Sequence, residues 1–80
     1  NMKQSKGKIK NWWKHYPDKC WGSEGLGYII CGTFVDHPDF DGKSGYTSFV
    51  TQHNEELGVV ETLNSYYTLI GPPIKEPVHA

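Results

Sequence analysis

Four runs of β-branched and aromatic residues follow one another between residues 28 and 70, and they constrain the fold more than any other feature of the chain. Such runs, bounded by glycine and polar residues, are typical of β-strands. We expect strands over residues 28–35, 46–53, 58–63 and 66–70. The polar segment 36–45 is too long for a tight hairpin. The prolines of Gly71-Pro72-Pro73 end the last strand, because proline cannot donate a ladder hydrogen bond.

The last two runs predict a hairpin whose two turn residues are Asn64 and Ser65. Asparagine tolerates the positive φ that such a turn demands. The expected pairs are Leu63 with Tyr66, Thr62 with Tyr67, Glu61 with Thr68, Val60 with Leu69 and Val59 with Ile70. Both faces of this sheet then carry apolar side chains, so each face needs a cover or the sheet must curl.

A different periodicity precedes the strands. Ile9, Trp12, Trp13 and Tyr16 recur at i, i+3, i+4 and i+7, which predicts one face of a helix that Pro17 ends. A helix of about two to three turns is not stable alone and needs a partner surface. The predicted fold class is therefore α+β: an N-terminal amphipathic helix packed on a four-stranded, strongly curved, barrel-like antiparallel β-sheet.

The length of 80 residues predicts a single domain, 1–80, with a thin core. Three Trp, five Tyr and three Phe are expected to fill that core, since two Cys make no disulfide scaffold. Residues 1–7 and 74–80 show no core signal and are expected to be flexible. Neither a signal peptide nor an apolar run of membrane-spanning length is found, so we expect a cytoplasmic protein without membrane contact.

The net charge of −1 hides an asymmetry along the chain. Residues 1–20 hold six of the eight Lys and one acid, Asp18, whereas residues 21–80 hold eight acids and two Lys. Arginine, the preferred side chain for reading bases, is absent. Lys8, Lys10 and Lys14 then form a candidate nucleic-acid or nucleotide site, with adjacent Trp side chains as stacking surfaces. The alternative is that the basic segment neutralises an acidic body.

Candidate metal and catalytic motifs are incomplete. The loop from His37 to Gly42 matches half of an EF-hand calcium loop, but His37 and Ser48 occupy positions that need acids. Zinc binding by Cys20 and Cys31 with histidines lacks a Cys-x-x-Cys pair. Cys20 near His15 could be a nucleophile, yet an isolated pair of this kind is usually incidental. We therefore expect no metal site, no cofactor and no enzymatic activity.

The segment Tyr46-Thr47-Ser48-Phe49-Val50, followed by residues 60–69, resembles short accessory proteins of bacteriophages. Those proteins share a "T-S-x-V" strand followed by "V-x-T-x-N-S-x-Y-x-L", and the resemblance covers about residues 28–71. It implies a non-enzymatic inhibitor that binds and disables a host factor, such as a restriction or CRISPR component, in the bacterial cytoplasm.

Two kinds of side chain are candidates for contacting such a partner. One Trp of the adjacent pair is expected to be exposed and to anchor an interface. Acids of the strand region are expected to compete for a basic nucleic-acid site on the host protein. The candidate contact residues are Trp12, Trp13, Asp36, Asp39, Asp41, Glu55, Glu56 and Glu61. A single helix covers one sheet face, so a homodimer that covers the other face is also expected.

Overall fold

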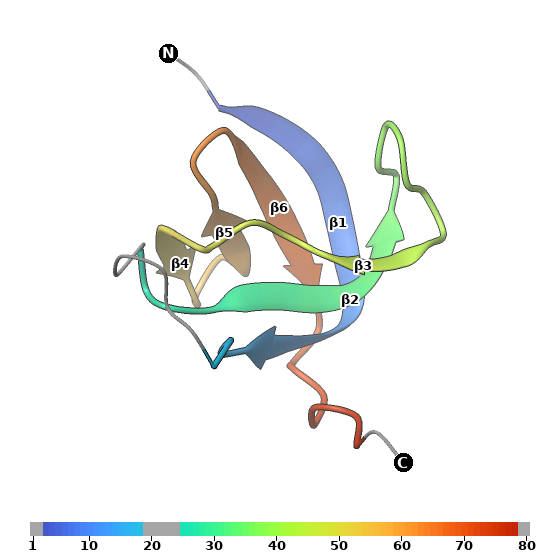
Figure 1. Cartoon of the computed structure of the whole chain (residues 1–80). Coiled ribbons are helices and arrows are strands. Elements are labelled where there is room, and N and C mark those ends of the chain that lie inside the picture. Colours follow the sequence, from blue (N-terminus) through green and yellow to red (C-terminus); the bar gives the residue numbers. More distant parts are fainter. Residues whose placement is uncertain (1–2, 19–24, 79–80) are drawn as a thin grey trace.

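The computed structural model describes residues 3–18 and 25–78, and in these residues the chain is all-β (Figure 1). The strands are β1 (Gln4–His15), β2 (Ile29–Val35), β3 (Ser44–Tyr46), β4 (Gln52–Asn54), β5 (Val59–Glu61) and β6 (Ser65–Ile70). They form one six-stranded sheet in the order β3-β2-β1-β6-β5-β4. The central pair β1–β6 is parallel and the other pairs are antiparallel, so the sheet is mixed.

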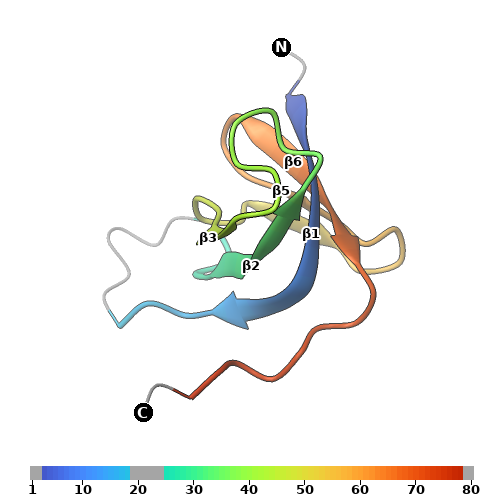
Figure 2. The same cartoon turned by 90° about the vertical axis from the view of Figure 1, so that its right-hand side faces the viewer.

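The α+β prediction is wrong, because the described residues contain no helix and the sheet is not closed into a barrel. It follows that no helix in the described part of the chain is long and apolar enough to cross a membrane. The segment predicted to be helical lies mostly in β1, which bends strongly along its length (Figures 1 and 2). Residues 4–7, where the sequence predicted no element, are the first part of the same strand.

A β-bulge in β1 explains why this strand has helix-like spacing. Its register with β2 shifts by one residue between Lys10 and Trp13. Asn11 occupies the bulge with a φ of 51°, in the left-handed region that asparagine tolerates. Because of the extra residue, Ile9 and Trp12 both face the core although they are three positions apart. An i, i+3 apolar pair is therefore compatible with a bulged strand as well as with a helix.

Gly32 in β2 makes room for this bulge. A Cβ atom at Gly32 would lie 2.6 Å from Ile9 Cγ2 and 2.8 Å from the Lys10 carbonyl oxygen. Any side chain at this position would push the two strands apart. The bulge in β1 and the glycine in β2 are thus two parts of one packing arrangement.

The runs predicted over residues 28–35, 58–63 and 66–70 are found as β2, β5 and β6. The run over 46–53 is divided, because β3 ends at Tyr46 and β4 begins at Gln52 on the opposite edge of the sheet. Residues 47–51 connect the two edges. The Thr47 N–H donates to the Ile30 carbonyl (2.9 Å), and the Thr51 N–H donates to the Glu61 carbonyl (2.7 Å). A four-stranded sheet was therefore a wrong prediction.

The β5–β6 hairpin is confirmed as an element, but its predicted register is wrong by two residues. Val60 pairs with Tyr67, so the turn residues are Leu63 and Asn64. The backbone N–H of Thr62 donates to the Ser65 carbonyl (2.8 Å), and the Thr62 hydroxyl donates to the same oxygen (3.3 Å). Among the described non-glycine residues, positive φ occurs at Asn11 and Asp36, so Asn64 does not have the predicted left-handed conformation.

The core lies on the inner face of the curved sheet. It is formed by Ile9, Trp12, Tyr28, Ile30, Phe34, Val50, Val60, Tyr67 and Leu69. Side chains alternate along β2 and β6, with every second residue buried. Four aromatic residues belong to this core, whereas Tyr16, Phe40 and Tyr46 are exposed, so the prediction that all the aromatic side chains fill the core is wrong.

Candidate partner-binding site

Four rings form a cluster beneath the loop that joins β2 to β3. Phe34 ends the buried series of β2, His37 and Phe40 lie in the loop, and Tyr67 comes from β6. The ring centroids of Phe34 and His37 are 4.8 Å apart, those of His37 and Phe40 are 5.0 Å apart, and those of Phe34 and Tyr67 are 6.1 Å apart. This cluster, here called the aromatic cluster, attaches the loop to the sheet.

His37 organises the loop with its ring nitrogen as well as with its ring faces. Its Nδ1 accepts hydrogen bonds from the backbone N–H groups of Asp39 (3.0 Å) and Phe40 (3.1 Å). Its side chain is buried, at 8 % exposure. The loop is closed by two more bonds: the Asp36 N–H donates to Asp41 Oδ1 (2.6 Å) and the Gly42 N–H donates to the Phe34 carbonyl (2.8 Å). The loop is therefore pre-organised around the imidazole.

A cavity of about 250 Å³ adjoins the aromatic cluster, and we call it the aromatic pocket. It is lined by Phe34, His37, Phe40, Lys43, Ser44, Gly45, Tyr46 and Tyr67. Phe40 and Tyr46 are 51 % and 72 % exposed, so two of the rings that line the pocket are open to solvent. A Cβ atom at Gly45 would lie 2.7 Å from Phe34 Cε2, so the β3 backbone touches the edge of this ring. Burial raises the pKa of Tyr67, so its phenol remains neutral.

Three of the predicted contact acids lie in the same loop as the pocket. Asp36 Oδ2 is 3.7 Å from Lys8 Nζ. Among the described residues, neither Asp39 nor Asp41 takes part in an ion pair. These three acids share one loop, in which the Asp36 N–H donates to Asp41 Oδ1, but none of them is among the residues that line the aromatic pocket.

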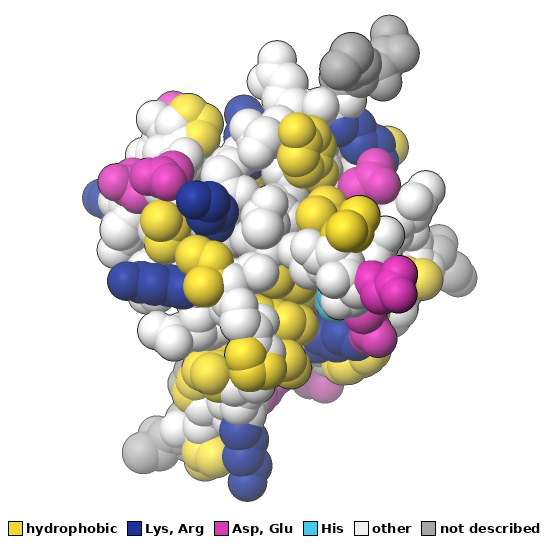
Figure 3. Space-filling view, turned by 180° about the vertical axis from the view of Figure 1, so that it is seen from behind, with side chains coloured by type: hydrophobic (Ala, Val, Ile, Leu, Met, Phe, Trp, Pro, Cys, Tyr) yellow, Lys and Arg dark blue, Asp and Glu magenta, His cyan; other side chains and the backbone are white. Residues whose placement is uncertain are grey.

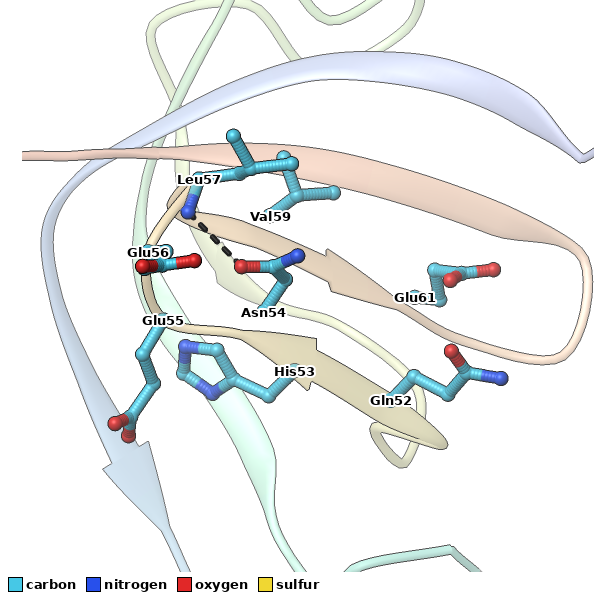
Figure 4. Close-up of a pocket in the computed structure, with 8 residues that line it drawn as sticks. All are labelled: Gln52, His53, Asn54, Glu55, Glu56, Leu57, Val59 and Glu61. Atoms are coloured by element: carbon cyan, nitrogen blue, oxygen red, sulfur yellow. Dashed lines mark hydrogen bonds between the residues drawn. The ribbon is translucent and has the colours of Figure 1, made fainter.

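The other three predicted acids lie on the β4–β5 hairpin, around an open cleft of about 680 Å³ (Figure 4). Glu55 and Glu61 lie at opposite ends of this hairpin, and Glu56 belongs to its turn. Glu55 is 3.7 Å from Lys14 and Glu61 is 3.3 Å from Lys3. In Figures 1 and 2 this hairpin lies well apart from the β2–β3 loop. The six acids therefore form two separate groups and not one acidic surface.

The two adjacent Trp residues point to opposite faces of β1. Trp12 is buried and its Nε1–H donates to the Gly71 carbonyl (2.8 Å), so it cannot contact a partner in the folded protein. Trp13 is half-buried on the outer face of the sheet. It is in register with Cys31 of β2, and Cys31 is in register with Tyr46 of β3. Burial raises the pKa of the Cys31 thiol and the Glu76 carboxylate raises it further, which disfavours a reactive thiolate.

The three candidate lysines do not share a face. Lys8 and Lys10 are in register with residues on the outer face of β2. Lys14, in contrast, is in register with buried Ile30, and its ammonium lies 4.8 Å from the centroid of the Tyr28 ring. Lys8 and Lys14 each lie within 4 Å of an acid. On the face seen in Figure 3, basic and acidic side chains lie close to one another. This arrangement agrees with the alternative that the lysines of residues 1–20 neutralise acids of residues 21–80.

A second polar group lies at the other end of the sheet. The Tyr28 hydroxyl is 2.7 Å from His53 Nδ1, beside a cavity of about 310 Å³ that Trp12 and Lys14 also line. Burial lowers the pKa of His53 and the Lys14 ammonium lowers it further, while the Glu55 carboxylate acts in the opposite direction. Burial also raises the pKa of Tyr28. Both groups are therefore neutral at physiological pH, and their contact is a partly buried hydrogen bond.

Other sequence hypotheses lie partly outside the described residues. Cys20, Trp21 and His79 fall there, so the structure does not address a zinc site or a nucleophile that uses them. Among residues 3–18 and 25–78, no group of three or more His, Cys, Asp or Glu side chains is placed to hold a metal ion. Sequence reasoning missed the aromatic pocket, because its lining comes from β2, β3, β6 and the β2–β3 loop, which meet only in the folded sheet. Comparisons of the chain with protein-family models, with curated proteins and with solved structures found no match.

Proposed function

We propose that this chain is a small non-enzymatic binding protein that occupies the surface of a partner protein, with the aromatic pocket as its main contact. The observation that carries the proposal is the exposure of Phe40 and Tyr46 beside a pocket with pre-organised walls. Exposed aromatic side chains at a concave site are the usual anchors of protein interfaces. Pre-organisation supports binding, because little conformational entropy is lost on association.

The kind of partner follows from the resemblance to bacteriophage accessory proteins. That resemblance makes a bacterial host factor the expected target and inhibition by surface occupation the expected mode of action. Asp36, Asp39 and Asp41 lie in the loop that also carries the pocket residues His37 and Phe40, and they are the candidate acids that would compete for a basic site on that target. A homodimer remains a prediction that oligomeric-state measurements would check.

Nucleic-acid binding through Lys8, Lys10 and Lys14 receives less support. Two of these three lysines are engaged with acids of the same chain, and one of the three faces away from the others. Of the two proposed stacking surfaces, Trp12 is buried and Trp13 is half-buried. A phosphate backbone would have to displace internal ion pairs to bind this surface.

Capture from bacterial lysate with matched variants tests the proposed contact surface. The test variants are Phe40→Ser and Tyr46→Ser, and the control is Leu63→Ser, which removes an apolar side chain that is 75 % exposed in the β5–β6 turn. We expect the wild-type chain and the Leu63 variant to retain the same protein, and both pocket variants to lose it. Equal capture by all four chains would show that the pocket is not the contact surface. Thermal melting of each variant verifies that it is folded.

A further inference from the structure

We propose that the cavity between the β5–β6 turn and the connector of residues 47–51 binds a small, neutral, hydroxyl-rich ligand of the size of a mono- or disaccharide. This cavity, here called the neutral cavity, has a volume of about 560 Å³. It shares only Tyr67 with the aromatic pocket, so a ligand here is separate from the proposed contact with a partner protein. Its lining residues are Gly25, Ser48, Phe49, Thr51, Thr62, Leu63, Asn64, Ser65 and Tyr67.

Backbone hydrogen bonds hold two walls of the neutral cavity in place. The connector runs from β3 at one edge of the sheet to β4 at the other (Figure 1). The Thr51 N–H donates to the Glu61 carbonyl (2.7 Å), which attaches the connector to β5. The Thr62 N–H donates to the Ser65 carbonyl (2.8 Å), which closes the β5–β6 turn. The volume lies within the range of about 300–1,000 Å³ that is usual for small-molecule sites, so a ligand would meet a largely pre-formed cavity.

Two hydroxyl groups of this lining lie in nearly buried side chains and have no partner. Ser65 is 9 % exposed and Tyr67 is 8 % exposed, and neither hydroxyl makes a hydrogen bond with the described residues. No fully enclosed side-chain oxygen or nitrogen of the described residues lacks a partner, so both hydroxyls remain accessible. Tyr67 lines two cavities, whereas Ser65 lines the neutral cavity alone. An unpaired hydroxyl on a nearly buried side chain costs stability, and a ligand that bonds to it recovers that cost.

The other polar side chains of the lining supply both donors and acceptors. The hydroxyls of Thr51 and Thr62 each donate to a backbone carbonyl (3.2 Å and 3.3 Å), so their oxygen lone pairs remain as acceptors. The Ser48 hydroxyl and the Asn64 amide are exposed and have no side-chain partner in the described part of the chain, so each can donate and accept. A ligand hydroxyl also donates and accepts, so a ligand rich in hydroxyls matches this set.

The lining excludes charge and includes apolar surface. None of the described residues that line the neutral cavity is charged, whereas each of the three cavities described above includes Lys14, Lys43 or Glu55. A phosphate or an amine would lose water here without gaining an opposite charge. Phe49 is half-buried and Leu63 is 75 % exposed, so the cavity also offers apolar contacts. A sugar ring combines an apolar face of C–H groups with a rim of hydroxyls and would use both properties.

The test titrates the ¹⁵N-labelled full chain with D-glucose, D-galactose, D-mannose and N-acetyl-D-glucosamine, and follows the amide chemical shifts. We expect saturable binding of at least one sugar, with shifts concentrated in residues 48–51 and 62–67, which line or flank the neutral cavity. The charged probes are the 6-phosphate and the 2-amino derivative of the sugar that binds most tightly, and cyclohexanol is the probe with a single hydroxyl. Each of these should bind at least about threefold more weakly than that sugar.

Matched variants test the nearly buried hydroxyl. Ser65→Ala should weaken the sugar by about threefold to tenfold and leave Tm unchanged or higher, because this hydroxyl has no partner in the free protein. Ser44→Ala is the control, since Ser44 is exposed and lines the aromatic pocket instead, and it should change neither quantity. Leu63→Ser should weaken the sugar while it still captures the lysate protein.

Four results would each overturn the inference: no shifts with any of the four sugars, shifts outside the neutral cavity, equal binding by the charged derivatives, or an unchanged affinity for the sugar in Ser65→Ala. Lysate capture by the Phe40 and Tyr46 variants tests the aromatic pocket, which lies in another part of the chain. Failure of sugar binding therefore leaves the proposed function standing, and loss of the proposed function leaves sugar binding standing.

Discussion

Replacement of His37 by Phe tests whether the imidazole nitrogen organises the β2–β3 loop. Phenylalanine keeps a ring of similar size beside Phe34 and Tyr67 but removes the Nδ1 acceptor. The backbone N–H groups of Asp39 and Phe40 then lose their partner. We expect the loop to open locally and the aromatic pocket to lose one wall.

The magnitude follows from the number and burial of these hydrogen bonds. An unsatisfied buried donor costs about 1–3 kcal/mol, and the lower end applies here because both bonds are only partly buried. Loss of the two bonds should therefore destabilise the protein by about 2 kcal/mol. For a domain of this size, that corresponds to a fall in Tm of about 8–16 °C.

Thermal melting and amide hydrogen exchange measure the two consequences separately. His37→Asn is the matched control, because its side-chain oxygen accepts a backbone N–H two residues ahead while the ring contacts are lost. Both variants should melt earlier, but only the Phe variant should lose protection at the amides of Asp39 and Phe40. If the Phe variant melts like the wild type and keeps both amides protected, the imidazole nitrogen does not hold the loop.

Three further predictions concern the bulge and the second polar group. Gly32→Ala should cost about 1–3 kcal/mol in unfolding free energy, measured by urea denaturation, because its Cβ would lie 2.8 Å from the Lys10 carbonyl oxygen. Asn11→Gly should leave that free energy nearly unchanged while Asn11→Val lowers it by about 1–2 kcal/mol, since φ is 51° there; equal effects would argue against the bulge. The pKa of His53 is lower in the folded state than in the unfolded state, so the unfolded state binds a proton first as the pH decreases. The free energy of unfolding should therefore be highest above about pH 6.5 and should fall as the pH decreases below that value. His53→Gln, which keeps an acceptor for Tyr28, should flatten this dependence of Tm on pH, and an unchanged slope would contradict the assignment.

The strands that were predicted are those whose signal is local. Residues 28–35 and 66–70 are rich in β-branched and aromatic side chains and form β2 and β6. The helix prediction failed because the bulge at Asn11 places Ile9 and Trp12 on one face, a spacing that a helix also produces. Whether an i, i+3 pair belongs to a helix or to a bulged strand depends on the strand opposite it. That information lies about twenty residues away, at Gly32.

The candidate site was predictable only in part for the same reason. Asp39 and Asp41 were among the expected contact residues, because acids in a polar loop are visible in the sequence. The aromatic pocket depends on Tyr67, which reaches Phe34 only because β1 lies between β2 and β6 in the sheet. The pairing of Ile9 with both Phe34 and Leu69 sets this proximity. No spacing within one segment could have indicated it.

Three of the four ion pairs among the described residues join β1 to acids elsewhere in the chain, and Asp36 of the β2–β3 loop is one of those acids. β1 supplies Lys8, Lys14 and His15, and each lies within 4 Å of an acid from a different part of the chain. These contacts neutralise charge along the sheet at little cost, since exposed pairs contribute only about 0–1 kcal/mol to stability. Asp39 and Asp41 of the same loop are exposed, and no ion pair among the described residues includes them. A partner that covers this loop would have to pair the two carboxylates or leave them hydrated, because burial of an unpaired carboxylate is costly.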